Sequence, residues 1–430
     1  MQPLPSRLAE LFVEAQQEEP TRRVSFLLGS GFSRPDGLPL VSDINGRLAT
    51  LKEGDFFLYQ DQSAGFYGAG QPRGPNHRMT YSDRRLAEEF TAFYVSNVLG
   101  GNPTKFNYEV FYDYMKEYLR NKLHREEIEG FCEAYNNKYG FKGHFDNALN
   151  YLSRYLNIFN QLIAGLLERA KYYQDISLDT YPGYEPFCRA LYHQLKRSQV
   201  HVHSLNHDML FDFIASSVGG LYQHYCDGFA EAGSPYFGKL SYRLNKTDEE
   251  FYKTYHVRLQ HYTGTYGKRL SFFKLHGSIN YYQMHRQGDQ RPVTIKGDHV
   301  VGEVLLERFD DQKQQHVYEN PFSDKFPAYL TGTTQKITQY GNAFYKELFE
   351  HFQDNLEYSE KLVVIGYGFQ DSGINELLEK YYLSQGKPVL VIDVRQPESS
   401  LLENYRESFR FSTAGMAGTN HEVYRNFFEE

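Results

Sequence analysis

The chain has 430 residues, of which 40% are hydrophobic, and its formal net charge at pH 7 is −8. This length allows two domains, or one domain with a large insertion. The acidic balance argues against nucleic-acid binding driven by overall charge. No apolar run approaches the length of a membrane span, and the first residues, Met1 to Pro5, lack the apolar core of a signal peptide. We therefore expect a cytoplasmic protein without membrane contact.

The first predicted strand is the apolar run Val24 to Leu28, and a glycine turn, Gly29-Ser30-Gly31-Phe32-Ser33, follows it. After the turn, Ser42 or Asp43 is suited to cap a helix. A strand, a glycine turn and a helix form the phosphate-binding corner of nucleotide folds, where glycines let the backbone approach a pyrophosphate. The same pattern also occurs as an ordinary turn in α/β proteins, so this stretch alone leaves both interpretations open.

The next part of the chain is predicted to be mainly helical. Residues 1–20 suggest a short amphipathic helix, and residues 55–76 suggest a glycine-rich loop. From about residue 81 to residue 194, apolar residues recur every three or four positions. We expect a helical insertion over residues 53–194, and a nucleotide-binding domain built from residues 1–52 and 195–430.

Four more segments combine a strand with a polar or glycine-containing end. Residues 231–268, in contrast, are polar and poorly periodic, and they suggest an excursion with a hairpin. The four segments that end in a polar residue or a glycine are 199–204 before Asn206 and Asp208, 272–274 before His276, 361–365 before Gly366 and Gly368, and 389–392 before Asp393. Strands that alternate with helices predict an α/β fold with a Rossmann-like, doubly wound parallel sheet, whose strand ends face one ligand crevice.

Cysteine and histidine usage argues against a metal site. Cys132, Cys188 and Cys226 are odd in number and form no CxxC pair, which excludes a four-cysteine zinc module and a disulfide framework. His201 and His203 share one face of a predicted strand, but no set of carboxylates accompanies them. We therefore expect no bound metal.

The ordered motifs resemble those of sirtuin-type NAD-binding domains. The glycine turn with Gly37-Leu38-Pro39 resembles the sirtuin opening GAGxS…G(I/L)P. Leu205-Asn206-His207-Asp208 is similar to the (T/Q)N(Y/I)D segment, and Lys274-Leu275-His276-Gly277-Ser278 is similar to the HGS strand end that carries the catalytic histidine. The stretch Val364 to Phe369, with Asp371 and Asn375, resembles the late glycine strand of sirtuin-like domains in bacterial anti-phage systems.

Two departures point away from the protein-deacylating sirtuins. The zinc cysteines are missing, and the chain continues Leu40-Val41 after Gly37-Leu38-Pro39 where those enzymes continue GIPDFR. The resemblance therefore implies a zinc-independent NAD+ hydrolase of anti-phage defence that depletes cellular NAD. It also implies a homo-oligomer, control by assembly and a HerA-type ATPase partner. The remaining alternatives are a deacylase or ADP-ribosyltransferase that uses the same site, and a scaffold that binds NAD or ADP-ribose without turnover.

Cleavage of the nicotinamide–ribose bond needs positioning and one base. We expect His276 to accept the proton and Asn206 to hold ribose hydroxyls or the attacking water, while Asp208 orients the loop. The glycine turn would take the pyrophosphate, and Asp393 the adenine-side ribose. Each residue also has a structural interpretation: Asn206 or Asp208 as a helix cap, His276 as a packed core residue, and Asp393 as a surface acid.

Overall fold

The computed structural model describes residues 22–58, 64–66, 81–139, 148–167, 183–243, 252–286, 292–297, 303–329 and 343–430. The chain forms two compact units. The first comprises Met1–Asp36, Lys171–Tyr329 and Asn342–Glu430, and the second comprises Gly37–Ala170 and Leu330–Gly341. The domain boundaries expected after residues 52 and 194 stay a prediction. The amphipathic helix expected at residues 1–20 lies outside the described residues.

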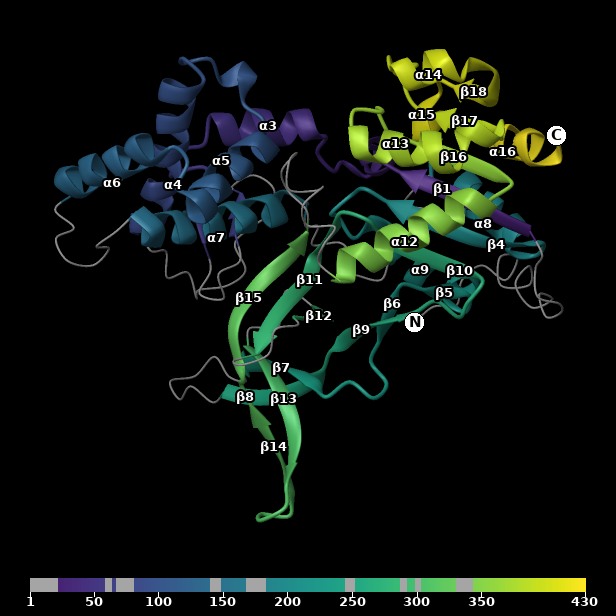
Figure 1. Cartoon of the computed structure of the whole chain (residues 1–430). Helices are drawn as coiled ribbons and strands as arrows, with labels where there is room; N and C mark the ends of the chain where they lie inside the picture. Colours follow the sequence, from purple (N-terminus) through teal and green to yellow (C-terminus); the bar gives the residue numbers. More distant parts are fainter. Residues whose placement is uncertain are drawn as a thin grey trace. The chain divides into compact units, whose positions relative to one another are not determined.

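A seven-stranded parallel sheet forms the centre of the first unit (Figure 1). Its strands follow the order β18-β17-β16-β1-β4-β10-β5, and every pairing between neighbours is parallel. Their bounds are β1 (Arg22–Leu28), β4 (Ser198–Ser204), β5 (Tyr225–Cys226), β10 (Leu270–Lys274), β16 (Lys361–Ile365), β17 (Val389–Ile392) and β18 (Phe409–Ser412). The chain runs from β1 to β4 on one side and later returns to β16 on the other, which creates the switch point of a doubly wound sheet.

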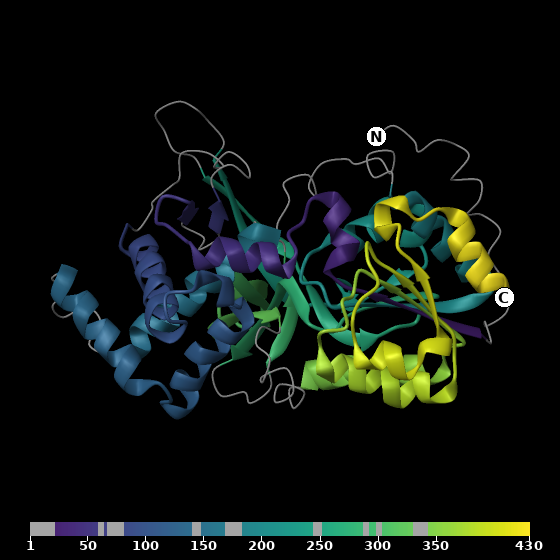
Figure 2. The same cartoon turned by 90° about the horizontal axis from the view of Figure 1, so that it is seen from above.

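Helices cover both faces of this sheet. On one face, the ring of Phe26 lies 5.8 Å from that of Phe187 in α8 (Glu185–Leu195). On the other, the hydroxyl of Ser25 lies 2.7 Å from that of Ser359, just after α12 (Ala343–Tyr358). Successive strand residues point to opposite faces, so both sides of β1 are buried. In Figure 2 the yellow-green helices lie along one face. The expected α/β class with a doubly wound parallel sheet is confirmed.

The other helices of the first unit are short or lie late in the chain. They are α2 (Ser30–Ser33), α9 (Leu210–Ser217), α10 (Gly219–Tyr222), α13 (Ser372–Tyr381), α14 (Ser400–Asn404), α15 (Gly415–Gly418) and α16 (His421–Glu429). The helix α2 lies inside the glycine turn and has only four residues. A helix this short contributes little of the dipole on which the phosphate-corner argument depends.

Two antiparallel sheets complete the first unit, and the sequence predicted them only in part. One has the order β15-β11-β12-β9-β6, and the other has the order β14-β13-β7-β8. Their bounds are β6 (Gly228–Ala230), β7 (Tyr236–Arg243), β8 (Tyr252–Arg258), β9 (Gln260–Thr265), β11 (Gly277–Arg286), β12 (Val293–Lys296), β13 (Glu303–Asp310), β14 (Gln315–Glu319) and β15 (Phe322–Tyr329). The expected excursion over 231–268 is thus largely strand. The hairpin expected there is confirmed, because β7 pairs antiparallel with β8. Strand β7 also pairs with β13, more than sixty residues later, and local periodicity does not reveal that contact.

The second unit is mainly helical, as expected for an insertion between β1 and β4. It contains α3 (Val41–Ala49), α4 (Tyr81–Phe93), α5 (Tyr108–Asn121), α6 (Arg125–Tyr139), α7 (Ala148–Leu167) and the two-stranded ladder of β2 (Phe56–Leu58) with β3 (Ala64–Phe66). Asp43 does cap α3, but from inside its first turn, by accepting a hydrogen bond from the Leu40 N–H at 3.0 Å. Within the described residues, no helix is both long and apolar enough to cross a membrane.

Candidate active site at the carboxyl edge of the parallel sheet

The sequence-predicted site residues follow the carboxyl ends of five strands in the parallel sheet. Gly29 follows β1, Asn206 comes two residues after β4, and His276 comes two residues after β10. Gly366 follows β16, and Asp393 follows β17. Parallel strands end at the same edge, so these residues share the edge where open α/β sheets bind ligands.

Three glycines hold the turns after β1 and β16 together, backbone against backbone. The N–H of Gly29 donates to the Ile365 carbonyl at 2.9 Å, and the N–H of Gly31 donates to the Gly366 carbonyl at 3.0 Å. A Cβ added at Gly29 would lie 2.5 Å from the Gly366 oxygen, and one at Gly31 would lie 2.6 Å from the Gly366 Cα. Gly366 itself has a φ of +63°, which favours glycine. The fold therefore requires glycine at all three positions.

Asn206 is buried beside the glycine turn. Its side-chain amide donates to the Gly29 carbonyl at 2.8 Å and to the Ser33 hydroxyl at 3.1 Å. Its backbone N–H donates to the Ser204 hydroxyl at 3.1 Å. The two bonds from the amide nitrogen fix the orientation of the side chain, while its Oδ1 atom has no hydrogen-bond partner among the described residues. Asn206 can therefore still accept one hydrogen bond from a ligand or from water.

Asp208 lies deeper in the same loop and is fully buried. One carboxylate oxygen accepts a hydrogen bond from the Leu210 N–H at 2.9 Å, which caps the start of α9. Burial raises the pKa of Asp208, and the nearby ammonium of Lys274 and the hydroxyl of Ser33 partly oppose this rise. Asp208 therefore caps α9, as its structural interpretation expected, and its orienting role in the site stays a prediction.

His276 faces a carboxylate from a neighbouring element. Its Nε2 atom lies 3.5 Å from the carboxylate of Asp371, and both side chains are largely buried. The second oxygen of Asp371 accepts hydrogen bonds from the N–H groups of Gly373 and Ile374, so this carboxylate also caps α13. A histidine beside a fixed carboxylate has the arrangement of a general base with an orienting partner. Asp371 was not among the predicted site residues, although an Asp before a predicted helix is a cap signal.

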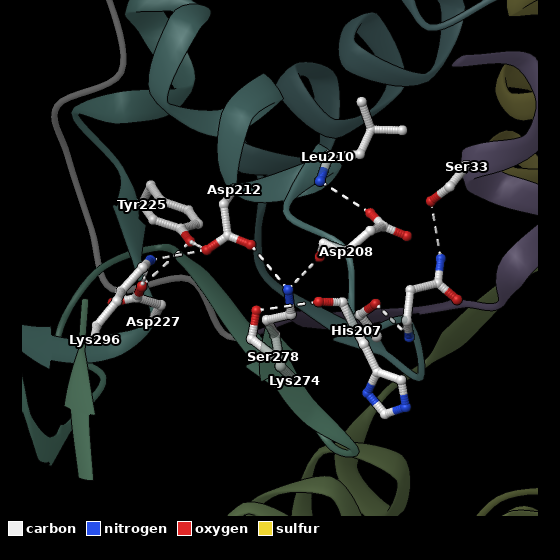
Figure 3. Close-up of polar contacts among 12 residues, drawn as sticks. Ser33, His207, Asp208, Leu210, Asp212, Tyr225, Asp227, Lys274, Ser278 and Lys296 are labelled. Atoms are coloured by element: carbon white, nitrogen blue, oxygen red, sulfur yellow. Dashed lines mark hydrogen bonds and ion pairs between the residues drawn. The ribbon is translucent and has the colours of Figure 1, made fainter. Parts of the chain in front are cut away.

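A network of buried charged side chains contacts the Asn206–Asp208 loop (Figure 3). The Lys274 ammonium donates to the backbone carbonyl of Asp208 and lies 3.3 Å from the Asp212 carboxylate. The Lys296 ammonium lies 2.8 Å from the Asp212 carboxylate and 2.6 Å from the Asp227 carboxylate. Burial lowers the pKa of Lys274, with Asp212 and Asp208 opposing this. Burial also acts to raise the pKa of Asp212, but Lys296 and Lys274 outweigh it and hold that pKa below its usual range.

Sequence reasoning missed this network because its charges come from separate elements. The only local signal is Lys274 itself, a charged residue that ends the apolar run of β10 and is buried in the structure. A buried lysine requires anionic or carbonyl partners, and the sequence does not show which ones meet it.

The remaining predicted residues have more structural surroundings. Phe32 is buried against the ring of Tyr184, at a centroid distance of 5.2 Å, and its carbonyl accepts the Tyr184 hydroxyl at 2.6 Å. The carbonyl of Gly368 accepts a hydrogen bond from Gln370 at 3.1 Å. Asp393 accepts the N–H of Val394 at 2.7 Å. Within the described part of the chain, no hydrogen bond joins Asp393 or Gly368 to the residues around Asn206 and His276.

The histidines that suggested a metal in the sequence lie in the core. His203 stacks on Phe273 at a centroid distance of 5.0 Å, and its ring lies 4.7 Å from that of Phe352. Burial lowers the pKa of His201 to about 3, and Arg23 and His351 add to this effect. No group of three or more His, Cys, Asp or Glu side chains in the described segments is arranged to hold a metal ion.

Comparisons with known proteins leave the family open. No protein-family model matches the chain, and no curated protein matches it. Among solved structures, it is similar to a triple mutant of Sir2 homologues in complex with 2′-O-acetyl ADP ribose, at 10% identity and a TM-score of 0.37 over 99% of this chain and 96% of that one. It is also similar to a Sir2 homologue mutant in complex with ADP ribose, at 10% identity and a TM-score of 0.36 over 99% and 97%.

A third solved structure, which concerns the structural basis of sirtuin substrate affinity, aligns at 10% identity and a TM-score of 0.34 over 98% of this chain and 97% of that one. These scores are too low to support an argument about this chain. Its fold and candidate site are therefore described from their own geometry.

Proposed function

We propose that this protein is a zinc-independent NAD+ hydrolase that releases nicotinamide and ADP-ribose. The observation that carries the proposal is the pairing of His276 with Asp371 at 3.5 Å, at the same sheet edge as the buried side chain of Asn206. The order of the motifs, which resembles that of sirtuin-type domains, supports the same reaction. A histidine and an amide at the carboxyl edge of a parallel sheet are sufficient for a reaction that needs positioning and one base.

In the proposed reaction, water attacks the ribose carbon, and the bond from that carbon to the nicotinamide nitrogen breaks. Nicotinamide leaves with the bonding electrons, and His276 accepts the proton released by the water or by a ribose hydroxyl. The Asp371 carboxylate, 3.5 Å away, stabilises the imidazolium that results. Asp371 is held in place by the start of α13, so its charge is positioned before the reaction begins.

Asn206 is proposed to hold a ribose hydroxyl or the attacking water through Oδ1. Its amide nitrogen is already committed to Gly29 and Ser33, so the acceptor has a fixed direction. In the glycine turn, the N–H groups of Gly29, Gly31 and Phe32 donate within the protein. The proposed pyrophosphate contact therefore falls on Ser30, whose N–H begins α2 and has no partner inside that helix. Asp393 is proposed to bind the hydroxyls of the adenine-side ribose.

The test is to incubate the purified protein with NAD+, without any peptide, and to separate nicotinamide and ADP-ribose by chromatography. Asn206→Ala and His276→Ala should each abolish nicotinamide release. His316→Ala is the matched control, because this histidine lies on β14 with 60% of its side chain exposed. Release that persists in both site variants would refute the assigned residues. Release that requires an acyl-peptide would favour the deacylase, and NAD binding without release, even with a HerA-type ATPase and ATP added, would favour the scaffold.

The resemblance to anti-phage sirtuin-like enzymes supports a more specific proposal. An enzyme that depletes NAD harms the cell when it is always active, so we propose control by homo-oligomer assembly or by a HerA-type ATPase partner. The corresponding role is anti-phage defence in the cytoplasm. These proposals rest on the motifs alone and are separable from the hydrolase chemistry, which the NAD+ assay tests first.

A further inference from the structure

The edge of the parallel sheet opposite the candidate active site is basic. Three adjacent strands, β1, β4 and β10, each begin at or directly after a pair of basic residues. We call these six residues the basic edge: Arg22, Arg23, Lys196, Arg197, Lys268 and Arg269. The net charge of −8 does not reveal this edge, because the six residues are dispersed in the sequence and the sheet alone brings them together.

The strand register places the three pairs side by side. Arg22 is the register partner of Ser198, one residue after Arg197. The N–H of Val200 donates to the carbonyl of Arg269 at 2.8 Å. The Arg269 guanidinium donates to the Leu195 carbonyl at 3.1 Å, next to Lys196 in the chain. Neighbouring strands lie about 4.8 Å apart, so the pairs form a continuous row across three strands.

The side chains of the basic edge are largely exposed, and the acidic residues near it are Glu360, which pairs with Arg22, and Glu430, which acts on Lys361 at the adjacent start of β16. Arg22 has 66% of its side chain exposed, and its ion-pair partner on this edge is Glu360 at 3.8 Å. Lys196, Arg197 and Lys268 are exposed as well. The positive charge of the basic edge also lowers the pKa of two nearby histidines. The pKa of His193 is lowered by burial and by cations that include Lys196 and Arg197, and that of His224 by burial and by Arg269 and Lys268.

Exposed tyrosines lie beside these cations. Tyr358 and Tyr222 have exposed fractions of 61% and 60%, the highest of the exposed aromatic residues in the described part of the chain. The guanidinium carbon of Arg23 lies 5.3 Å from the centre of the Tyr358 ring. The ammonium of Lys268 lies 5.8 Å from the centre of the Tyr222 ring. Cations that alternate with accessible aromatic rings are the arrangement by which proteins bind single-stranded nucleic acid.

We propose that the basic edge binds single-stranded nucleic acid, with the cations contacting phosphates and Tyr222 and Tyr358 stacking on bases. The proposal is independent of NAD chemistry, because these residues begin the strands whose opposite ends carry the candidate active site. A single strand fits better than a duplex, since only unpaired bases offer a free face for stacking. An acidic protein or an anionic membrane would use the cations but would give the two exposed rings no stacking partner.

The test measures binding of a fluorescein-labelled oligo(dT) of about 16 nucleotides by fluorescence anisotropy, with a duplex of the same length as the comparison. The charge variant is Lys196→Glu with Lys268→Glu. Its matched control is Lys105→Glu with Arg120→Glu, two exposed residues of the second unit whose reversal changes the net charge equally. The stacking variant is Tyr222→Ala with Tyr358→Ala. Circular dichroism verifies that each variant is folded.

We expect the charge variant to weaken oligo(dT) binding by about tenfold or more, and to make the slope of log K against log salt concentration shallower by about 1.4, or about 0.7 per lost phosphate contact. The control should bind like the wild type. The stacking variant loses two stacked bases and should weaken oligo(dT) binding by roughly 30-fold or more, with the salt slope unchanged. Equal losses in the charge variant and its control, equal affinity for duplex and single strand, or tighter binding to polyglutamate or to phosphatidylserine vesicles would each overturn the proposal.

Discussion

The buried histidines of β4 make the first unit sensitive to acid, and the size of the effect follows from their environment. Burial lowers the pKa of His201 to about 3, whereas an unfolded histidine titrates near 6.5. Burial also lowers the pKa of His203. Below pH 6.5, the unfolded chain therefore binds protons that the folded chain refuses, and stability falls as the pH falls towards the folded-state pKa. Between about pH 7.5 and about pH 5, His201 lowers the free energy of unfolding by about 2 kcal/mol, and His203 acts in the same direction.

The perturbation is His201→Leu, which removes the titrating group and keeps an apolar side chain of similar size in the core. The assay is hydrogen exchange of the β4 amides at the two pH values, which reports the opening free energy of this sheet rather than of the whole chain. The variant should lose about 2 kcal/mol less than the wild type on acidification. Val202→Ala, in the same buried strand, is the control, because its cost should be equal at both pH values. An unchanged pH dependence in His201→Leu would refute the reasoning.

Two more predictions concern the site. Asp371→Asn keeps an oxygen that can cap α13 but removes the negative charge 3.5 Å from His276. Because that charge interacts with the imidazolium by up to about 4 kcal/mol, nicotinamide release should fall by about 10²- to 10³-fold, while hydrogen exchange shows α13 intact. Release at the wild-type rate would show that Asp371 has no part in the mechanism. Lys274→Met leaves Asp212 with one ammonium partner fewer and should cost about 3 kcal/mol in urea unfolding, and adding Asp212→Asn should recover part of that loss. A double variant no more stable than the single one would contradict this.

The parallel sheet was predictable where strands are buried on both faces. The runs in β1, β16 and β17 are almost continuously apolar, which is typical of central strands in parallel sheets. Strand β18 was missed, because its short sequence Phe409-Arg410-Phe411-Ser412 alternates as an edge strand does and lies only on the border of the sheet. The antiparallel strands were predicted only in part, as a hairpin within 231–268, which the pairing of β7 with β8 confirms. The pairing of β7 with β13 could not be predicted, because the two strands are distant in the sequence and meet only through tertiary contacts.

The positions of the candidate site residues follow from topology more than from residue type. Once β4, β10 and β16 are parallel neighbours of β1 or of one another, Asn206, His276 and Gly366 must lie at one edge. The contacts around them could not be predicted in the same way. Asp371 meets His276 only because α13 starts beside the end of β10, and Lys296 reaches Asp212 from a separate antiparallel sheet. Such contacts depend on how distant elements pack against each other, and no local sequence pattern predicts that packing.

The glycine turn shows why a motif has to be separated into its packing and its ligand components. In the sequence, Gly29 and Gly31 suggest a backbone that must approach a pyrophosphate. In the structure, both already lack room for a Cβ because the backbone of Gly366 occupies that space. An alanine at either position would perturb the turn whether or not a nucleotide binds there, so lost activity in such a variant could not distinguish a folding defect from a binding defect. His276 is the more informative position, because its contact with the Asp371 carboxylate involves no close backbone approach. Asn206 also donates to Gly29 and Ser33, so its variant needs a measurement of folding beside the measurement of activity.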